Sequence, residues 1–198
     1  MIEFIQKLDL KLFLYFNSLN TPFFDRIMWF ISGKYEWIPL YLLLIFWIFY
    51  RFRKKGWLIL GLTIIVFALS DSGSVHLFKN VFERLRPSRN PDLEGMVHLV
   101  NGYRGGLYGF ISGHAANTFG LAVFMSFIFK ERWFVISILI WAGIVSYSRI
   151  YLGVHYPFDV LCGAIWGSSM AAIMYLVYNK LTLKTFKNPV LGKNEQKP

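Results

Sequence analysis

The sequence predicts an all-α integral membrane protein, a bundle of about five membrane-spanning helices preceded by amphipathic helices at the interface. Three observations support this class. The chain of 198 residues is 56% hydrophobic and only 16% charged, whereas a soluble domain carries about 25% charged residues. Its aromatic content of 19% suits membrane interfaces, where one end of a ring is dry and the other wet. The apolar residues also gather in long runs, separated by basic or polar turns.

The apolar runs define the individual spans. The first, residues 37–50, has no charged residue and is followed by a dense basic turn over 51–55, a pattern typical of a cytoplasmic loop. The further spans are predicted over residues 56–78, 113–129, 133–149 and 157–178. Near the end of the chain, Gly163 and Gly167 form a small-residue stripe that favours packing within the bundle over a dimer face.

The N-terminal segment reads as two amphipathic helices. Over residues 2–19, apolar residues recur at helical spacing at Ile2, Ile5, Leu8, Leu12 and Phe16, with charged and amide side chains between them. A break at Asn20-Thr21-Pro22 precedes a second short helix over 23–32. Both are expected to lie on the membrane. The alternative is one ragged spanning segment, which would make the number of spans six.

These elements divide the chain into three parts. Residues 1–35 form the interfacial region, residues 36–179 the transmembrane domain, and residues 180–198 a basic, polar cytoplasmic tail. If the 51–55 turn is cytoplasmic, successive crossings place loop 79–112 and segment 148–159 together on the outer face.

The net charge indicates which class of molecule the protein binds, and the cysteine content indicates whether it can form an intramolecular disulfide. The net charge of +10 lies between apolar spans, which indicates anionic lipid or a phosphorylated substrate rather than nucleic acid. The lone Cys162 excludes an intramolecular disulfide. No obligate protein partner is evident.

The segment from Ser148 to Asp159 carries the most specific chemistry. His155 and Asp159 are four residues apart, so they lie close to one face if a helix begins near Pro157. A carboxylate there can bind the Nδ1–H of the imidazole and leave Nε2 free to attack. Arg149 adds a guanidinium that suits phosphate oxygens. The structural alternative for these residues is a snorkelling arginine, a core histidine and a helix-capping aspartate.

Two further clusters lie upstream. Lys79 and Arg86 are seven residues apart, two helical turns, and are expected on one face of the end of the second span, which Pro87 stops. The alternative for this pair is an ordinary basic helix end. In the second cluster, Ser112 can cap a helix and Gly113 lets its backbone approach an anion closely, while His114 sits in the first turn. An ordinary cap beside an interfacial histidine is the alternative there.

Taken together, the pattern is Lys-x6-Arg-Pro, then Ser-Gly-His, then Ser-Arg-x5-His-x3-Asp. This signature resembles the type 2 phosphatidic acid phosphatases, membrane lipid phosphatases whose fold and site are similar to those of vanadium haloperoxidases. The resemblance covers about residues 56–178. The second motif of that family usually begins with proline, and this chain has Ile111 instead, which removes no side chain that touches phosphate.

The resemblance implies the roles of the site residues. His155 would be the nucleophile that forms a phosphohistidine, Asp159 would hold its ring, and His114 would protonate the leaving oxygen and then activate water. The phosphate cradle would consist of Lys79, Arg86, Arg149, Ser112 and the Gly113 N–H. Preorganised cations can stabilise phosphoryl transfer without a metal, and the sequence lacks the carboxylate cluster of a two-metal site. We therefore expect no metal and no other cofactor.

Two other groups have weaker assignments. The loop over residues 88–109 is a candidate for headgroup selection, in which Arg89, His98 and Arg104 would meet a second phosphate or a sugar. The alternative is a solvated loop. Asp71 and His76 lie on the second span and are candidates for a polar pair that supports the site. A separation of five residues is a poor helical spacing for such a pair.

The predicted function is hydrolysis of a lipid phosphate or diphosphate at the outer leaflet of a bacterial inner membrane. Family substrates include undecaprenyl diphosphate, phosphatidylglycerophosphate and lipid A phosphates, and the sequence does not separate them. A lipid phosphotransferase is one alternative, and a lipid-phosphate binding or transport protein without turnover is another. A binding protein needs neither His114 nor His155 as a reactive group.

Overall fold

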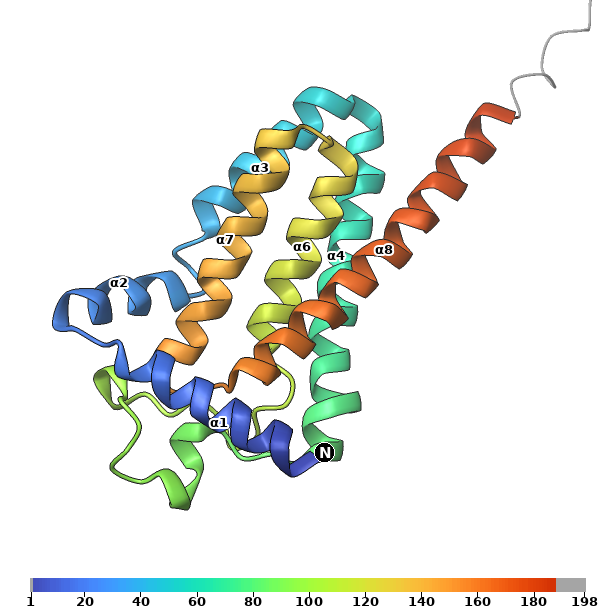
Figure 1. The fold of residues 1–198 in the computed structure, drawn as a ribbon. Helices are drawn as coiled ribbons and strands as arrows, with labels where there is room; N and C mark the ends of the chain where they lie inside the picture. The colour runs from blue at the N-terminus through green and yellow to red at the C-terminus, as the bar shows by residue number, and fades with distance from the viewer. Residues whose placement is uncertain (1, 188–198) are drawn as a thin grey trace, which may run out of the picture.

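The computed structural model describes residues 2–187, and the regular structure in this part of the chain is helical (Figure 1). Loop segments contribute one isolated bridge, between Leu85 and Tyr108. The helices are α1 (Ile2–Ser18), α2 (Pro22–Ser32), α3 (Ile38–Phe52), α4 (Gly56–Gly73), α5 (Asn80–Phe82), α6 (Gly113–Phe129), α7 (Arg132–Tyr151) and α8 (Pro157–Lys187). The prediction of an all-α fold is confirmed.

Five of these helices form the membrane bundle. By length and composition, the segments Ile38–Phe82, Arg132–Tyr151 and Pro157–Leu183 are able to cross a membrane, and Gly113–Phe129 is a shorter apolar helix. The first segment contains two helices, α3 and α4, because the chain reverses direction at Arg53, whose φ is +49° (Figure 1). The predicted five spans therefore correspond to α3, α4, α6, α7 and α8.

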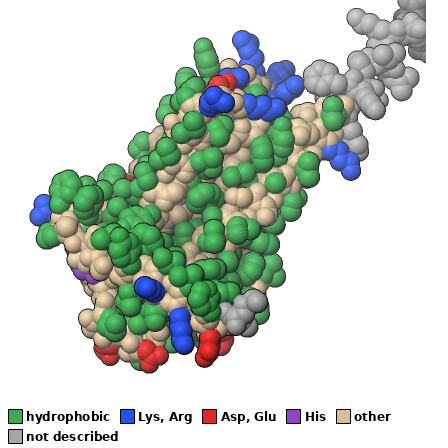
Figure 2. Space-filling model, in the orientation of Figure 1, with side chains coloured by type: hydrophobic (Ala, Val, Ile, Leu, Met, Phe, Trp, Pro, Cys, Tyr) green, Lys and Arg blue, Asp and Glu red, His purple; other side chains and the backbone are tan. Residues whose placement is uncertain are grey.

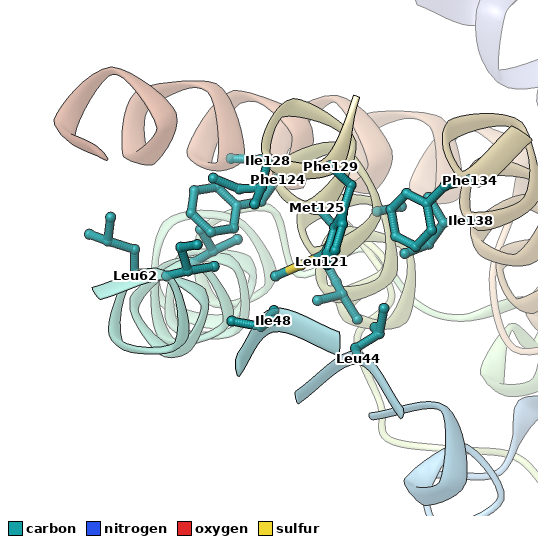
Figure 3. Packing of buried hydrophobic residues seen from close by; sticks show 14 of the residues in the cluster. Leu44, Ile48, Leu62, Leu121, Phe124, Met125, Ile128, Phe129, Phe134 and Ile138 are labelled. Atoms are coloured by element: carbon teal, nitrogen blue, oxygen red, sulfur yellow. The ribbon is translucent and has the colours of Figure 1, made fainter. Parts of the chain in front are cut away.

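The core of the bundle surrounds α6. Leu121, Phe124 and Met125 of α6 pack against Leu62 of α4 and Ile48 of α3 (Figure 3). These are large apolar side chains with little exposure, so they hold the bundle together by close packing. Apolar side chains also cover much of the flanks of the bundle in Figure 2, as expected for surfaces that face lipid.

The contact of α6 with α8 depends on two glycines. A Cβ at Gly163 would collide with the Ser112 carbonyl, and a Cβ at Gly167 would collide with the Ala116 carbonyl. The stripe therefore lets two backbones approach closely inside the bundle, as the sequence predicts. This close approach also joins the start of α6 to the start of α8, because the Ser112 N–H donates to the Asp159 carbonyl at 2.9 Å.

Helices α1 and α2 are separate and lie across one end of the bundle (Figure 1). Ile5 and Leu8 of the predicted apolar stripe of α1 are exposed, which is compatible with the expectation that this helix lies on the membrane. A different face docks on the bundle and carries Asp9, Phe13 and Asn17, which are buried. Polar side chains are accepted there because backbone and guanidinium groups of the bundle satisfy their hydrogen bonds.

The end of α4 differs from the expected straight helix. A π-helical segment, Ser74–Lys79, follows α4, and the short α5 ends at Glu83, whose φ is +46°. A left-handed residue stops the helix, so Arg86 lies in extended backbone beyond it. The expectation that Lys79 and Arg86 share one helical face is therefore wrong. Tertiary contacts bring them to the same site.

The C-terminal helix is longer than predicted. Helix α8 continues to Lys187 rather than ending near residue 178, because the sequence up to that point contains no glycine cap or proline to end it. The helix therefore includes the first part of the predicted polar tail, and residues 188–198 of that tail lie outside the described residues.

Basic side chains mark the end of the bundle opposite α1. Arg51 lies in the last turn of α3, and the basic turn Arg53–Lys55 follows it. Arg51 forms an ion pair with Glu131 in the turn between α6 and α7. Figure 2 shows this blue cluster at the top of the molecule. The predicted site residues lie at the other end, beside α1 and α2.

Candidate active site

The turn between α7 and α8 places His155 at the centre of the site. The imidazole is 1% exposed. Its Nε2 lies 3.1 Å from Nη1 of Arg86, and its Nδ1 lies 3.5 Å from Oδ2 of Asp159. Because a guanidinium only donates, Nε2 is the acceptor in this contact, and the ring proton is on Nδ1, facing the carboxylate.

Asp159 is fixed by other partners. It is fully buried in the first turn of α8. Its Oδ1 accepts a hydrogen bond from Nη1 of Arg84 at 2.8 Å, and its Oδ2 accepts one from the Tyr156 N–H at 3.0 Å. The carboxylate is thus held in place independently of its 3.5 Å contact with Nδ1 of His155. A fixed carboxylate can orient the ring and select its tautomer.

Burial and neighbouring charge keep His155 neutral. Burial lowers the pKa of the His155 imidazole well below its usual range, and the Arg86, Arg149 and Lys79 cations lower it further. The ring therefore keeps a lone pair on Nε2 at physiological pH. A neutral imidazole beside three cations is suited to attack an anionic group that those cations bind.

The two arginines approach the site from different elements. Arg86 is anchored by the carbonyl oxygens of Tyr108 and Val154, at 3.1 and 3.2 Å. Arg149, near the end of α7, is 4% exposed and donates to Ser32 of α2 and to the Tyr103 hydroxyl. Its Nε is buried without a hydrogen bond. Arg149 therefore retains unused donor capacity, which a bound oxyanion can satisfy.

The start of α6 forms the second side of the site. Ser112 caps the helix by accepting the Ala115 N–H at 3.4 Å, as predicted. Gly113 faces Lys79, because a Cβ there would lie 3.4 Å from the ammonium nitrogen and 3.2 Å from the Ser74 hydroxyl. Free N–H groups at a helix start attract anions. The missing side chain leaves this N-terminus open toward the lysine.

His114 lines a cavity beside these groups. The cavity has a volume of about 260 Å³ and is also bordered by Arg149, Tyr103, Trp29 and other residues of α2 and the following turn. The structure thus brings together all eight residues predicted for catalysis and phosphate binding. They come from the π-helical segment after α4, the loop after α5, the start of α6, the end of α7, the turn that follows it and the first turn of α8.

Two residues at the site were not assigned from the sequence. Arg84, in the same basic cluster as Arg86, binds Asp159 and also donates to Oδ2 of Asp9 at 2.7 Å. Asp9 is 1% exposed, and its Oδ1 accepts the Phe158 N–H at 2.9 Å. The only sequence signal for Asp9 was a negative charge between Leu8 and Leu10 in the first helix, which does not identify a partner so distant in the chain.

The residues predicted for headgroup selection lie apart from His114 and His155. His98 binds Asp25 of α2 at 2.9 Å and helps dock α1 through Asn17. Arg89 and Arg104 border a separate cavity in which none of the predicted catalytic or phosphate-binding residues takes part. Arg89 also donates to the Gly105 carbonyl.

Asp71 has partners other than His76. Its Oδ1 accepts a hydrogen bond from the Asn117 side chain at 3.3 Å, and its charge acts on Lys79. The π-helical segment changes the register between the two positions. Across the described residues, no group of three or more His, Cys, Asp or Glu side chains is placed to hold a metal ion. The metal-free reaction stays a prediction that a chelator tests.

A helical membrane bundle that gathers two imidazoles and three cations at one end is the arrangement expected of a membrane enzyme that transfers phosphoryl groups. The sequence profile of the PAP2 superfamily matches residues 56–183, well over half the chain. The chain belongs to the PAP2 superfamily, and the prediction of a membrane lipid phosphatase is confirmed.

Individual relatives agree with this assignment. The chain is 40% identical over 197 residues to a lipid A 4'-phosphatase of Bacteroides thetaiotaomicron, covering 98% of this chain and 87% of the relative. It is 33% identical over 167 residues to an undecaprenyl-diphosphatase of Sulfolobus acidocaldarius, covering 81% and 73%. The crystal structure of Aquifex aeolicus LpxE superposes with a TM-score of 0.68 at 28% identity, covering 85% of this chain and 94% of that one.

Proposed function

We propose that this protein removes a phosphate group from a lipid in two steps through a phosphohistidine at His155. The observation that carries the proposal is the Arg86–His155 contact of 3.1 Å. It places a neutral Nε2 beside a guanidinium that can hold the phosphoryl oxygens. The same cation both orients the ring and neutralises the charge of the group that the ring attacks.

In the first step, Arg86 transfers the hydrogen bond that it donates to Nε2 of His155 to a phosphoryl oxygen. The freed Nε2 lone pair attacks phosphorus, and the bond from phosphorus to the lipid oxygen breaks. His114, at the edge of the cavity, takes up a proton when the anionic phosphate of the substrate binds beside it, and it donates this proton to that oxygen. The Nδ1–H of the ring faces Asp159, so the positive charge that forms on the imidazole is stabilised by a carboxylate. Arg86, Arg149 and Lys79 hold the equatorial oxygens.

In the second step, water attacks the phosphohistidine. His114, now neutral, accepts a proton from the water, the bond between phosphorus and Nε2 breaks, and inorganic phosphate leaves. Both histidines return to their starting protonation states. No step requires a metal, and vanadate or tungstate should bind as mimics of the trigonal transition state.

For the substrate, we propose the phosphomonoester of a glycolipid, with lipid A 4'-phosphate as the first candidate. The support is the relative of that name, which aligns with nearly the whole chain. A polyprenyl diphosphate is the second candidate, because another relative is named as an undecaprenyl-diphosphatase. We place the site on the outer face of the inner membrane, since the basic turn over 51–55 lies at the opposite end.

The test is phosphate release by the purified protein in detergent from a panel of lipid A, phosphatidic acid, phosphatidylglycerophosphate and undecaprenyl diphosphate, with the His155→Ala variant as a blank. Release from lipid A at the highest kcat/KM supports the proposal. Release only from the diphosphate would replace the first substrate by the second. No release from any of the lipids would overturn the proposed hydrolysis.

A further inference from the structure

The cavity beside His114 has a defined role in the proposed reaction. It lies between α2, the turn over residues 33–37 and the loop that carries Tyr103. His114 protonates the leaving oxygen, so the group attached to that oxygen must occupy the space that His114 borders. We infer that this cavity is a saccharide subsite, which binds the sugar ring that carries the phosphate. The inference rests on the proposed function and adds the residues that select the substrate.

The volume of the cavity limits what it holds. At about 260 Å³, it is slightly smaller than pockets for drug-sized ligands, which span roughly 300–1,000 Å³. The space therefore suits one ring or a short headgroup, and the acyl chains must leave it toward the lipid. Arg149 borders the same cavity, so a phosphate held by this arginine remains attached to a group lying between α2 and α6.

Aromatic side chains form one wall. Trp29 meets Tyr103 edge to face, with ring centroids 5.6 Å apart, and Tyr35 also borders the cavity. Trp29 is 41% exposed and Tyr103 is 36% exposed, so part of each ring stays accessible to a ligand. A sugar presents C–H groups on the faces of its ring, and these pack well against large, rigid aromatic surfaces.

The cavity also has a carboxylate on its border, and one oxygen of this group lacks a hydrogen-bond donor. Oε2 of Glu36, which borders the cavity, is buried without a hydrogen-bond partner. Gly33 makes room for this group, because a Cβ at that position would collide with the Glu36 carboxylate. A buried carboxylate oxygen accepts hydrogen bonds and cannot donate them, and leaving it unpaired is costly. Because Glu36 borders the cavity, a rotation of its carboxylate brings this oxygen within reach of sugar hydroxyls, which supply the missing donors.

Glu36 also distinguishes a sugar from a second phosphate. A diphosphate substrate would place its leaving phosphate in this cavity, where the two anions would repel each other. Lys34 borders the cavity as well, but it is exposed, so water screens its ammonium more than it screens the buried carboxylate oxygen. Arg149 also borders the cavity, but it is assigned to the phosphate that is transferred. In the remaining space the Glu36 carboxylate disfavours a second anion and favours a neutral, hydroxylated leaving group.

This assignment moves headgroup selection to a new part of the chain. The sequence pointed to the loop over residues 88–109, whereas the cavity wall is built mainly by residues 29–36. That segment lies before residues 56–183, the part of the chain that the family profile matches. Selectivity within this family would then be set here by an N-terminal element that covers the site.

The experiment compares kcat/KM of Glu36→Gln and Trp29→Leu with that of the wild type on three substrates in the same detergent. These are an acylated glucosamine phosphate, phosphatidic acid, which has no sugar, and a polyprenyl diphosphate. Glu94→Gln is the matched control, because Glu94 is an exposed carboxylate that borders the separate cavity of Arg89 and Arg104. Size-exclusion chromatography in detergent checks that each variant is folded.

We expect both variants to lose about tenfold or more in kcat/KM on the sugar phosphate, the effect of one or two lost contacts. Phosphatidic acid should change by less than about threefold, and Glu36→Gln should hydrolyse the diphosphate as well as the wild type or better. Equal losses on all three substrates, or no loss on the sugar phosphate, would overturn the saccharide subsite. A wild-type protein that is inactive on every lipid would overturn the proposed function itself.

Discussion

Asp9 and Asp159 lie on either side of one guanidinium. Arg84 donates to Asp159 at 2.8 Å and to Asp9 at 2.7 Å, and it stacks over the Tyr156 ring at 4.0 Å. Because Asp159 in turn faces Nδ1 of His155, a helix at the very start of the chain is joined to the proposed nucleophile by three consecutive polar contacts. Under the proposed mechanism, the N-terminal helix therefore helps to position the nucleophile.

Removing the Asp9 carboxylate should slow the reaction without weakening substrate binding. In Asp9→Asn, Arg84 loses one of its two anionic partners and can shift relative to Asp159. A displacement of about 1 Å at the reacting group can cost up to about 10²-fold in rate. We expect kcat to fall by about one to two orders of magnitude while KM stays nearly constant.

The matched control for Asp9→Asn is Asn17→Ala. Asn17 docks the same helix through the Tyr151 carbonyl and the His98 N–H, without touching Arg84. If both variants lose kcat to the same extent, the effect arises from docking of α1 and the positioning role of Asp9 is refuted.

Replacing the proposed nucleophile should abolish turnover. His155→Ala removes the atom that forms the covalent intermediate, and no other imidazole contacts Arg86 in the described residues. Rapid quenching of the wild type with labelled substrate should trap an acid-labile phosphoenzyme that His155→Ala lacks. A retained rate within about tenfold of the wild type would contradict the assignment.

The Arg149 guanidinium should contribute mainly to the transition state. Arg149→Met removes a preorganised, buried donor while keeping much of the side-chain volume, so kcat should fall by about 10²–10³. Arg149→Lys should recover little of this loss, because an ammonium cannot form the bidentate hydrogen bonds that a guanidinium makes to phosphate oxygens. Steady-state kinetics on the best lipid substrate measures both, and full activity of Arg149→Lys would count against a bidentate role.

The His155 ring should remain neutral in mildly acidic solution. Its pKa in the folded protein is lowered well below 6.5, chiefly by burial, while in the unfolded chain it titrates near 6.5. Below about pH 6.5 the unfolded state binds the extra proton, so the free energy of unfolding falls as the pH drops through this window. Imidazole nitrogen NMR should show the neutral Nδ1–H form down to about pH 5.5. Titration of the folded protein near 6.5 would contradict this.

A chelator should leave the activity intact. The proposed reaction stabilises charge with Lys79, Arg86 and Arg149 rather than with a divalent cation. Phosphate release measured before and after extensive treatment with EDTA checks this. Inactivation by EDTA that a divalent metal reverses would refute the metal-free mechanism.

Much of the bundle was accessible from the sequence because each span carries its own signal. Uninterrupted apolar length marks α3, α4, α6, α7 and α8, and the polar breaks between them fall at the observed turns. The three motif clusters were found for the same reason. Each is short in sequence, and charged or titratable residues beside an apolar span are costly without a role.

The contacts between distant segments could not be predicted in this way. The straight-helix expectation for Lys79 and Arg86 failed because a π-helical segment and a left-handed Glu83 intervene. The apolar periodicity of α1 did not indicate which face of the helix docks on the bundle. The docked face includes the buried Asp9, whose carboxylate is satisfied by Arg84 and the Phe158 N–H.

By itself, the sequence determined the class of this protein, its five membrane helices and the eight residues proposed for phosphoryl transfer, since apolar length and motif spacing are local properties. Tertiary structure alone decided how α1 and α2 cover the site, that Asp9 joins Arg84 and Asp159, and that Glu36 and Trp29 border the space beside His114. The physical reason is that a buried charge or a cavity wall depends on partners from remote segments, and a linear pattern does not record which segments meet.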